Sequence, residues 1–111
     1  MKIRKAKKED IGRIDEIYVD GSIREGRLQF PDISIKGMKQ DLNKYKNSRP
    51  KGFLEEMKLK NHYWIVAEEN KEIIGFGQAW IKTKEICILE KIYINKRWAR
   101  QGIGLKLLKE L

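Results

Sequence analysis

The feature that most constrains the fold is a change of hydrophobic period between residues 61 and 94, which read NHYWIVAEENKEIIGFGQAWIKTKEICILEKIYI. β-Branched and aromatic residues gather there in three runs, separated by the short polar segments ENKE and KTKE. Polar turns of this length join neighbouring antiparallel strands. The stretch therefore predicts a three-stranded antiparallel meander, with strands at roughly 62–69, 72–82 and 85–95.

The last of these strands, ICILEKIYI, is apolar in both alternations except at Glu90 and Lys91. Such a pattern is typical of a central strand covered on both faces. Glu90 shares one alternation with four isoleucines, Ile86, Ile88, Ile92 and Ile94. In a buried row the pKa of Glu90 would rise toward the range of a general base, and a bulge beside it would turn the carboxylate into a cleft. The alternation also allows an exposed Glu90 that pairs with Lys91 or with a lysine across the sheet.

The residues before and after the meander predict a strand and several helices. MKIRKA indicates a short edge strand, and Ile11, Ile14, Ile17 and Tyr18 then form the apolar stripe of a helix whose end is loosened by Gly21 and Gly26. A second helix carries Ile35, Met38, Leu42 and Tyr45 until NSRPKG breaks it, and a third helical piece surrounds Phe53, Leu54 and Met57. The final helix is expected at 103–111. We expect residues 1–111 to form a single domain.

Between the last strand and the last helix lies the segment RQGIG, which holds Gly102 and Gly104. A Gly-x-Gly turn that enters a helix lets bare backbone N–H groups approach a phosphate at the positive end of the helix. Arg100 would add a positive charge. The turn lacks the third glycine of a dinucleotide-binding fingerprint, and no Gly-Lys-Ser/Thr follows it. An ordinary strand-to-helix turn is the alternative reading.

The charge and the cysteine content indicate which binding partners and which cellular compartment to expect. The 25 basic and 16 acidic residues give a net charge of +9, which favours an anionic partner or serves only solubility. Cys87, the single cysteine, lies in an apolar run and reads as a core thiol in a reducing compartment. Because the sequence has neither a long apolar span nor a signal-peptide core, we expect a cytoplasmic protein without a membrane partner.

In combination, an apolar strand with a glutamate, a Gly-x-Gly twelve residues later and an amphipathic helix resemble the acyl-CoA site of the GNAT family of N-acetyltransferases. The stretch LEKIYINKRWARQGIGLKLL is similar to the family's Q/R-x-x-G-x-G/A motif, and the preceding layout also matches. The resemblance implies an α/β (α+β) GNAT-like acyl-CoA N-acyltransferase fold: strand, two helices, three-strand antiparallel meander, helix. The family's fold continues with a further strand and helix, so it also implies a C-terminally truncated domain.

The resemblance assigns roles residue by residue. The backbone of Ile92, Tyr93 and Ile94 would bind the pantetheine arm of acetyl-CoA, and Glu90 would act as the base for direct attack by a primary amine. Ala99 stands where the motif has Gln or Arg, and we expect Arg100 to supply that charge. The pyrophosphate would be held by Arg100, Gln101, Gly102, Ile103, Gly104 and Leu105.

Other functions stay open at this point. The chain could be a catalytically incomplete CoA-binding or interaction module of the same fold. A small basic nucleic-acid-binding protein is less favoured, because aromatic residues are not interleaved with Lys and Arg on a platform. An uncovered sheet edge would favour a homodimer. Asp15, Glu16 and Asp20 are candidates for a local acidic pocket that would accept a basic amine.

Overall fold

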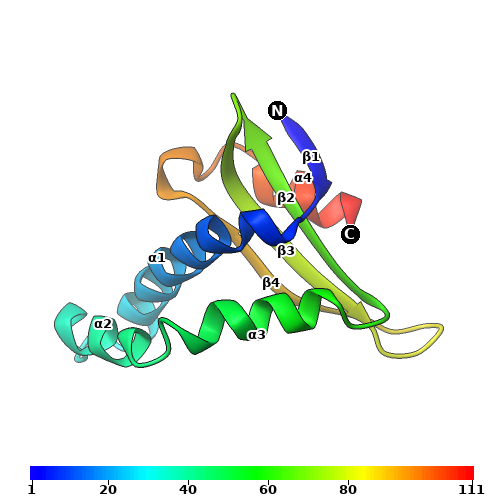
Figure 1. Cartoon of the computed structure of the whole chain (residues 1–111). Helices are drawn as coiled ribbons and strands as arrows, with labels where there is room; N and C mark the ends of the chain where they lie inside the picture. Colours follow the sequence, from blue (N-terminus) through cyan, green and yellow to red (C-terminus); the bar gives the residue numbers. More distant parts are fainter.

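The computed structural model describes residues 1–111 as a four-stranded antiparallel sheet in the order β1-β2-β3-β4, with helices on both faces (Figure 1). The strands are β1 (Lys2–Lys5), β2 (His62–Glu69), β3 (Glu72–Ile81) and β4 (Cys87–Ile94). The predicted α+β order and the antiparallel meander are confirmed. The predicted edge strand is β1, which pairs with β2 only.

The chain has four α-helices: α1 (Ile11–Gln29), α2 (Ile35–Asn43), α3 (Ser48–Met57) and α4 (Ile103–Glu110). The expectation that Gly21 and Gly26 loosen the end of α1 is wrong, since the helix continues through both. NSRPKG ends no helix but contributes the start of α3. Pro50 is the third residue of that helix, where its missing N–H leaves no hydrogen bond unmade. No helix combines the length and the apolar run needed to cross a membrane.

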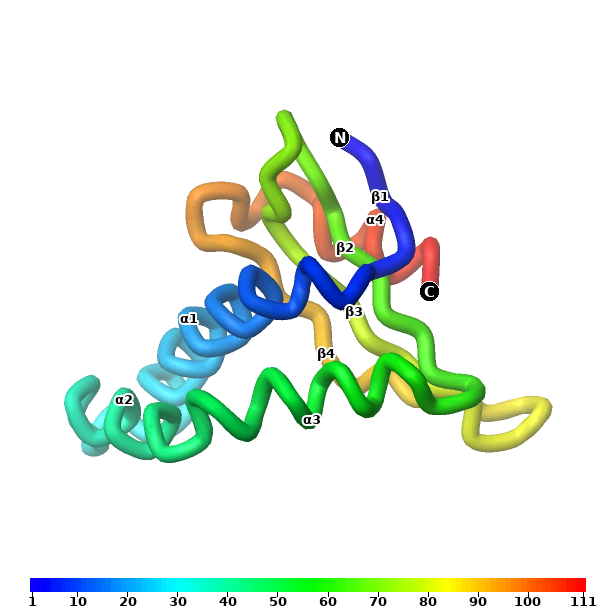
Figure 2. Tube along the Cα trace, viewed as in Figure 1, coloured from blue at the N-terminus to red at the C-terminus, as the bar shows by residue number.

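Apolar side chains form one cluster on each face of the sheet. The cluster under α1 and α3 includes Ile14, Ile17, Phe53, Trp64 and Phe76. The cluster under α4 is smaller and consists of Ala67, Ile74, Ile103 and Leu107. Figure 2 shows α2 at the far end of α1, away from the sheet, and none of its residues is buried.

The prediction that the last strand is central and covered on both faces is wrong. The interior strands are β2 and β3, and in β3 every residue from Ile73 to Ala79 is buried. β4 pairs only with β3 and forms an edge, where Cys87, Leu89 and Glu90 are exposed. Cys87 is thus not a core thiol. A run of apolar residues shows that a strand has apolar surroundings, but it does not show how many neighbours the strand has.

A β-bulge lies at Glu90. Gln78 pairs with Lys91 and Ala79 pairs with Leu89, so Glu90 is the extra residue on β4. The extra residue shifts the alternation by one, and Ile92 shares a face with Leu89 instead of Ile88. The row of four isoleucines with Glu90 therefore does not exist on one face.

The start of α1 is tied to β1 by a buried carboxylate. Asp10 accepts hydrogen bonds from both terminal nitrogens of Arg4, at 2.8 and 3.1 Å, and from the Lys7 backbone N–H at 2.7 Å. The hydrogen bond from Arg4 holds the pKa of Asp10 below its ordinary value, against the effect of burial. This contact connects β1 to the residue that immediately precedes α1.

Candidate functional site

A pocket of about 450 Å³ lies between α1, β4 and the turn before α4. Seven of the nine residues that the sequence assigned to cofactor binding line it, namely Ile92, Tyr93, Ile94, Arg100, Gly102, Ile103 and Gly104. Gln101 and Leu105 are exposed and lie outside the lining. The tertiary structure thus brings the end of β4 and the glycine turn to one cavity.

The part of β4 that borders this pocket directs backbone groups to the open edge. The Asn95 N–H donates to the Ile74 carbonyl at 2.8 Å, and hydrogen-bonded pairs alternate with non-bonded pairs along an antiparallel ladder. The pairs of Ile92 with Gly77 and of Ile94 with Gly75 are therefore non-bonded. As a result, the N–H and C=O groups of Ile92 and Ile94 point away from β3, where an extended ligand can pair with them.

The turn before α4 leaves its backbone accessible. Arg100 and Gly102 both have left-handed backbone conformations, with φ of 65° and 78°. Gly102 is the N-cap of α4, and a Cβ atom added to it would meet no atom within 4 Å. The first N–H groups of a helix have no intrahelical acceptor, and they carry the positive end of the helix dipole. The turn therefore offers an accessible, positively polarised backbone next to Arg100.

Two charged residues of the pocket, Arg24 and Glu25, were missed by the sequence reasoning. Both come from α1, and they share one helical face with Gly21 and Leu28, at spacings of three, four and seven residues. Arg24 Nη2 donates to the Ile94 carbonyl at 2.7 Å. The helical spacing could have shown that these four residues share one face of α1. Only the packing of α1 beside β4 shows that this face borders the pocket.

The only carboxylate in the lining, Glu25, is bonded to a phenol. The Tyr93 hydroxyl donates to Glu25 Oε2 at 3.3 Å. Burial raises the pKa of Tyr93, and the negative charge of Glu25 raises it further. Tyr93 therefore keeps its proton over a wider pH range than a free phenol.

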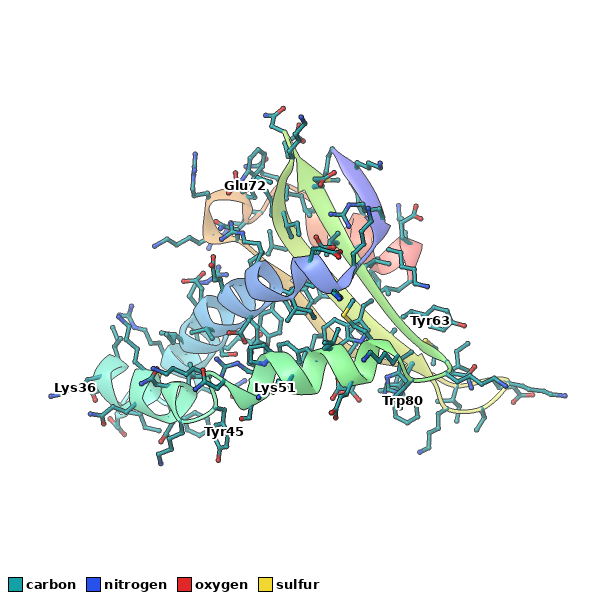
Figure 3. The ribbon with its side chains drawn as sticks, in the orientation of Figure 1. Lys36, Tyr45, Lys51, Tyr63, Glu72 and Trp80 are labelled. Atoms are coloured by element: carbon teal, nitrogen blue, oxygen red, sulfur yellow. The ribbon has the colours of Figure 1, made fainter.

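Glu90 lies outside this pocket. It is exposed, and its Oε1 accepts a hydrogen bond of 2.7 Å from Trp80 Nε1. Trp80 stands at the end of β3 away from Glu72 (Figure 3). The alternative pairing with Lys91 is not formed, because Lys91 Nζ donates to Gln78 Oε1 at 2.9 Å. The burial expected for Glu90 is therefore absent.

The three acidic residues proposed for an acceptor pocket line a larger hollow of about 1010 Å³ between α1 and α2. Asp15 pairs with Arg49 at 2.6 Å, Glu16 with Arg13 at 3.0 Å and Asp20 with Arg24 at 3.3 Å. These carboxylates are already neutralised by arginines. Their face of α1 is opposite the face that borders the β4 pocket. We therefore take the smaller pocket as the candidate site.

The sequence also matches a known protein family. The family model described as acetyltransferase (GNAT) family matches residues 33–111, which is more than half of the chain. The chain belongs to the acetyltransferase (GNAT) family. No curated protein matches its sequence closely enough to count as a relative.

Solved structures share the GNAT fold at low sequence identity. PaiA N-acetyltransferase from Thermoplasma acidophilum, in complex with coenzyme A, is 18% identical with a TM-score of 0.79, over 98% of this chain and 67% of that one. An acetyltransferase from Vibrio fischeri is 20% identical with a TM-score of 0.65, over 99% of this chain and 82% of that one. An aminoglycoside 6'-N-acetyltransferase complexed with coenzyme A is 16% identical with a TM-score of 0.65, over 99% and 52%. The family and the fold together indicate an acyltransferase that uses coenzyme A and an amine.

Proposed function

We propose that this protein transfers an acetyl group from acetyl-CoA to a primary amine by direct attack, as a cytoplasmic enzyme. One observation carries the proposal: the free edge of β4 and the accessible glycine turn border the same pocket. Acetyl-CoA has an extended amide-containing arm joined to a pyrophosphate. The arm can pair with the backbone of β4, and the pyrophosphate can accept hydrogen bonds from the N–H groups of the glycine turn.

The residues fit the cosubstrate as follows. The outward N–H and C=O groups of Ile92 and Ile94, with the intervening Tyr93, would pair with the pantetheine arm. The turn and the first residues of α4 would hold the pyrophosphate through the charge of Arg100 and through backbone N–H groups, over Arg100, Gln101, Gly102, Ile103, Gly104 and Leu105.

In the reaction, the amine nitrogen attacks the thioester carbonyl, the C–N bond forms, and the C–S bond breaks with the thiolate as leaving group. The nitrogen must lose one proton, and we assign its removal to Glu90 through a bridging water. Glu90 is the bulge residue of β4 and stands two residues before Ile92, so it is close to the part of β4 that would pair with the arm. Replacing Glu90 by Gln should lower kcat and leave acetyl-CoA affinity unchanged, and an unchanged kcat would remove Glu90 from this role.

Calorimetric titration with acetyl-CoA tests the cofactor site. Gly102→Glu puts a negative charge into the phosphate turn, and Gly102→Gln introduces a side chain of the same size and backbone strain without that charge. We expect the Glu variant to lose binding and the Gln variant to keep most of it. Equal loss in both variants would mean that backbone strain, and not repulsion of a phosphate, is responsible.

The same titration separates the alternatives. Binding of acetyl-CoA without turnover of any amine would indicate a CoA-binding module. No response to CoA, together with nucleic-acid binding that falls steeply with salt, would indicate the nucleic-acid-binding reading of the +9 charge.

We also propose a homodimer through the free edge of β4 around Leu89, outside the Ile92–Ile94 part that borders the pocket. This edge has no neighbouring strand, and Leu89 is exposed there. Light scattering at high protein concentration tests this proposal. A monomeric mass would refute it without affecting the proposed reaction.

A further inference from the structure

Arg24 of α1 is held against the edge of β4 by contacts on two sides. Its Nη2 donates to the Ile94 carbonyl at 2.7 Å, and its Nε lies 3.3 Å from Asp20 Oδ2. The side chain is half-buried between these partners. A guanidinium has five N–H donors in a rigid plane, so one bond to Ile94 leaves further donors for a ligand.

The pocket beside Arg24 holds further positive charge. The pocket that it borders is also lined by Arg100 and by Gly102 at the N-terminal end of α4. Positive charge thus reaches one cavity from two separate parts of the fold, α1 and the turn at the start of α4. The single carboxylate of the lining, Glu25, is engaged by the Tyr93 hydroxyl. Such a cavity suits an anion that accepts several hydrogen bonds.

We propose that Arg24 binds a phosphate group of the coenzyme, as a cationic ligand additional to the glycine turn. This inference rests on the proposed function. Ile94 is the last residue of β4 and lies between Ile92 and the turn. Arg24 therefore stands where an arm paired with β4 would join its pyrophosphate. Its bond to the Ile94 carbonyl positions the guanidinium before the ligand arrives, which lowers the entropic cost of binding.

The contact with Ile94 does not prevent the arm from pairing there. A carbonyl oxygen accepts two hydrogen bonds, so the Arg24 guanidinium and an amide N–H of the arm can share it. If Arg24 instead excluded the arm, its removal would strengthen binding. The two possibilities differ in the sign of the effect.

The experiment compares Arg24→Gln with Arg27→Gln, using CoA and pantetheine as the two ligands in calorimetric and NMR titrations. Arg27 is an exposed arginine of the same helix and does not border the pocket, so its replacement removes the same net charge. We expect Arg24→Gln to weaken CoA binding about tenfold or more, since it removes charge-assisted hydrogen bonds. Pantetheine, which has no phosphate, should bind the variant and the wild type equally. Arg27→Gln should change neither affinity by more than about twofold.

The other outcomes are distinct. Unchanged or tighter CoA binding by Arg24→Gln would overturn the proposal, and equal weakening for CoA and pantetheine would reduce Arg24 to a support of the edge strand. Failure of the wild type to bind CoA would instead refute the proposed function. Thermal melts of both variants should show the wild-type transition, because a loss of affinity caused by unfolding would shift it.

Discussion

Replacing Gly21 by Ala should destabilise the protein, although alanine normally stabilises a helix. Gly21 is a buried residue of α1 that faces the ring of Tyr93. An added Cβ would overlap the Tyr93 Cδ1 atom and lie 2.8 Å from Cε1, well inside the carbon–carbon contact distance of about 3.5–4.0 Å. The ring cannot turn aside easily, because it packs edge-on against Tyr18 and stacks on Phe76, with centroid distances of 5.4 and 5.7 Å.

The expected magnitude is the difference of two effects. Forcing an extra carbon into a packed core costs about 1–3 kcal/mol, and the helix propensity of alanine returns about 1 kcal/mol. Because the added Cβ would overlap Tyr93 Cδ1, the packing cost lies in the upper part of this range, at about 2–3 kcal/mol. The net loss in the free energy of unfolding is then about 1–2 kcal/mol, which lowers the melting temperature by about 4–8 °C per kcal/mol in a domain of this size. Gly12→Ala is the matched control in the same helix, because a Cβ there meets nothing within 4 Å. It should stabilise the protein by about 0.5–1 kcal/mol.

Urea denaturation of Gly21→Ala and Gly12→Ala measures whether the free energy of unfolding falls in the first variant and rises in the second. A double-mutant cycle with Tyr93→Ala tests its cause, since removal of the ring should make Gly21→Ala nearly neutral or stabilising. If Gly21→Ala were as stable as Gly12→Ala, the close packing of α1 on β4 would be wrong. The placement of Arg24 beside Ile94 would then lose its support as well.

Three further predictions concern backbone strain and pH. Arg100→Gly should raise the free energy of unfolding by about 1 kcal/mol, because glycine adopts the left-handed backbone conformation without strain. The same variant should bind acetyl-CoA more weakly in calorimetry, and a loss of stability would contradict the strain argument. Asp10→Asn should cost about 2–3 kcal/mol at pH 7 in urea melts. Because the pKa of Asp10 is depressed, its stabilisation is present above the ordinary pKa of 3.8 and is lost as pH falls through the folded-state pKa. The free energies of unfolding of the variant and the wild type should therefore converge in acid. A difference that stayed constant with pH would count against the Arg4 contact. The raised pKa of Tyr93 has the opposite sign: its contribution is present below the ordinary pKa of 10.0 and lost as pH rises through the folded-state pKa, so Tyr93→Phe should flatten the alkaline fall in stability.

The sequence by itself determined those parts of the fold that depend on neighbouring residues. The strand at His62–Glu69 and the start of the next strand at Glu72 are where alternation and the polar turn placed them, because a pleated strand and its turn are local structures. The Gly-x-Gly segment at the start of α4 is equally local. Its left-handed Gly102 adopts a conformation that glycine permits at no steric cost.

Only the tertiary structure decided what these elements surround. The position of β4 at the edge, the bulge at Glu90 and the resulting phase of Ile92 and Ile94 depend on pairing with β3, and alternation within β4 carries no information about a partner's register. The contribution of Arg24 depends on the packing of α1 against β4, at a separation of 70 residues along the chain. One wall of the candidate site, the glycine turn, could be predicted from the sequence because it consists of consecutive residues. The other wall, formed by α1, could not be predicted from the sequence, since contacts between distant segments are set by the packing of whole faces against one another.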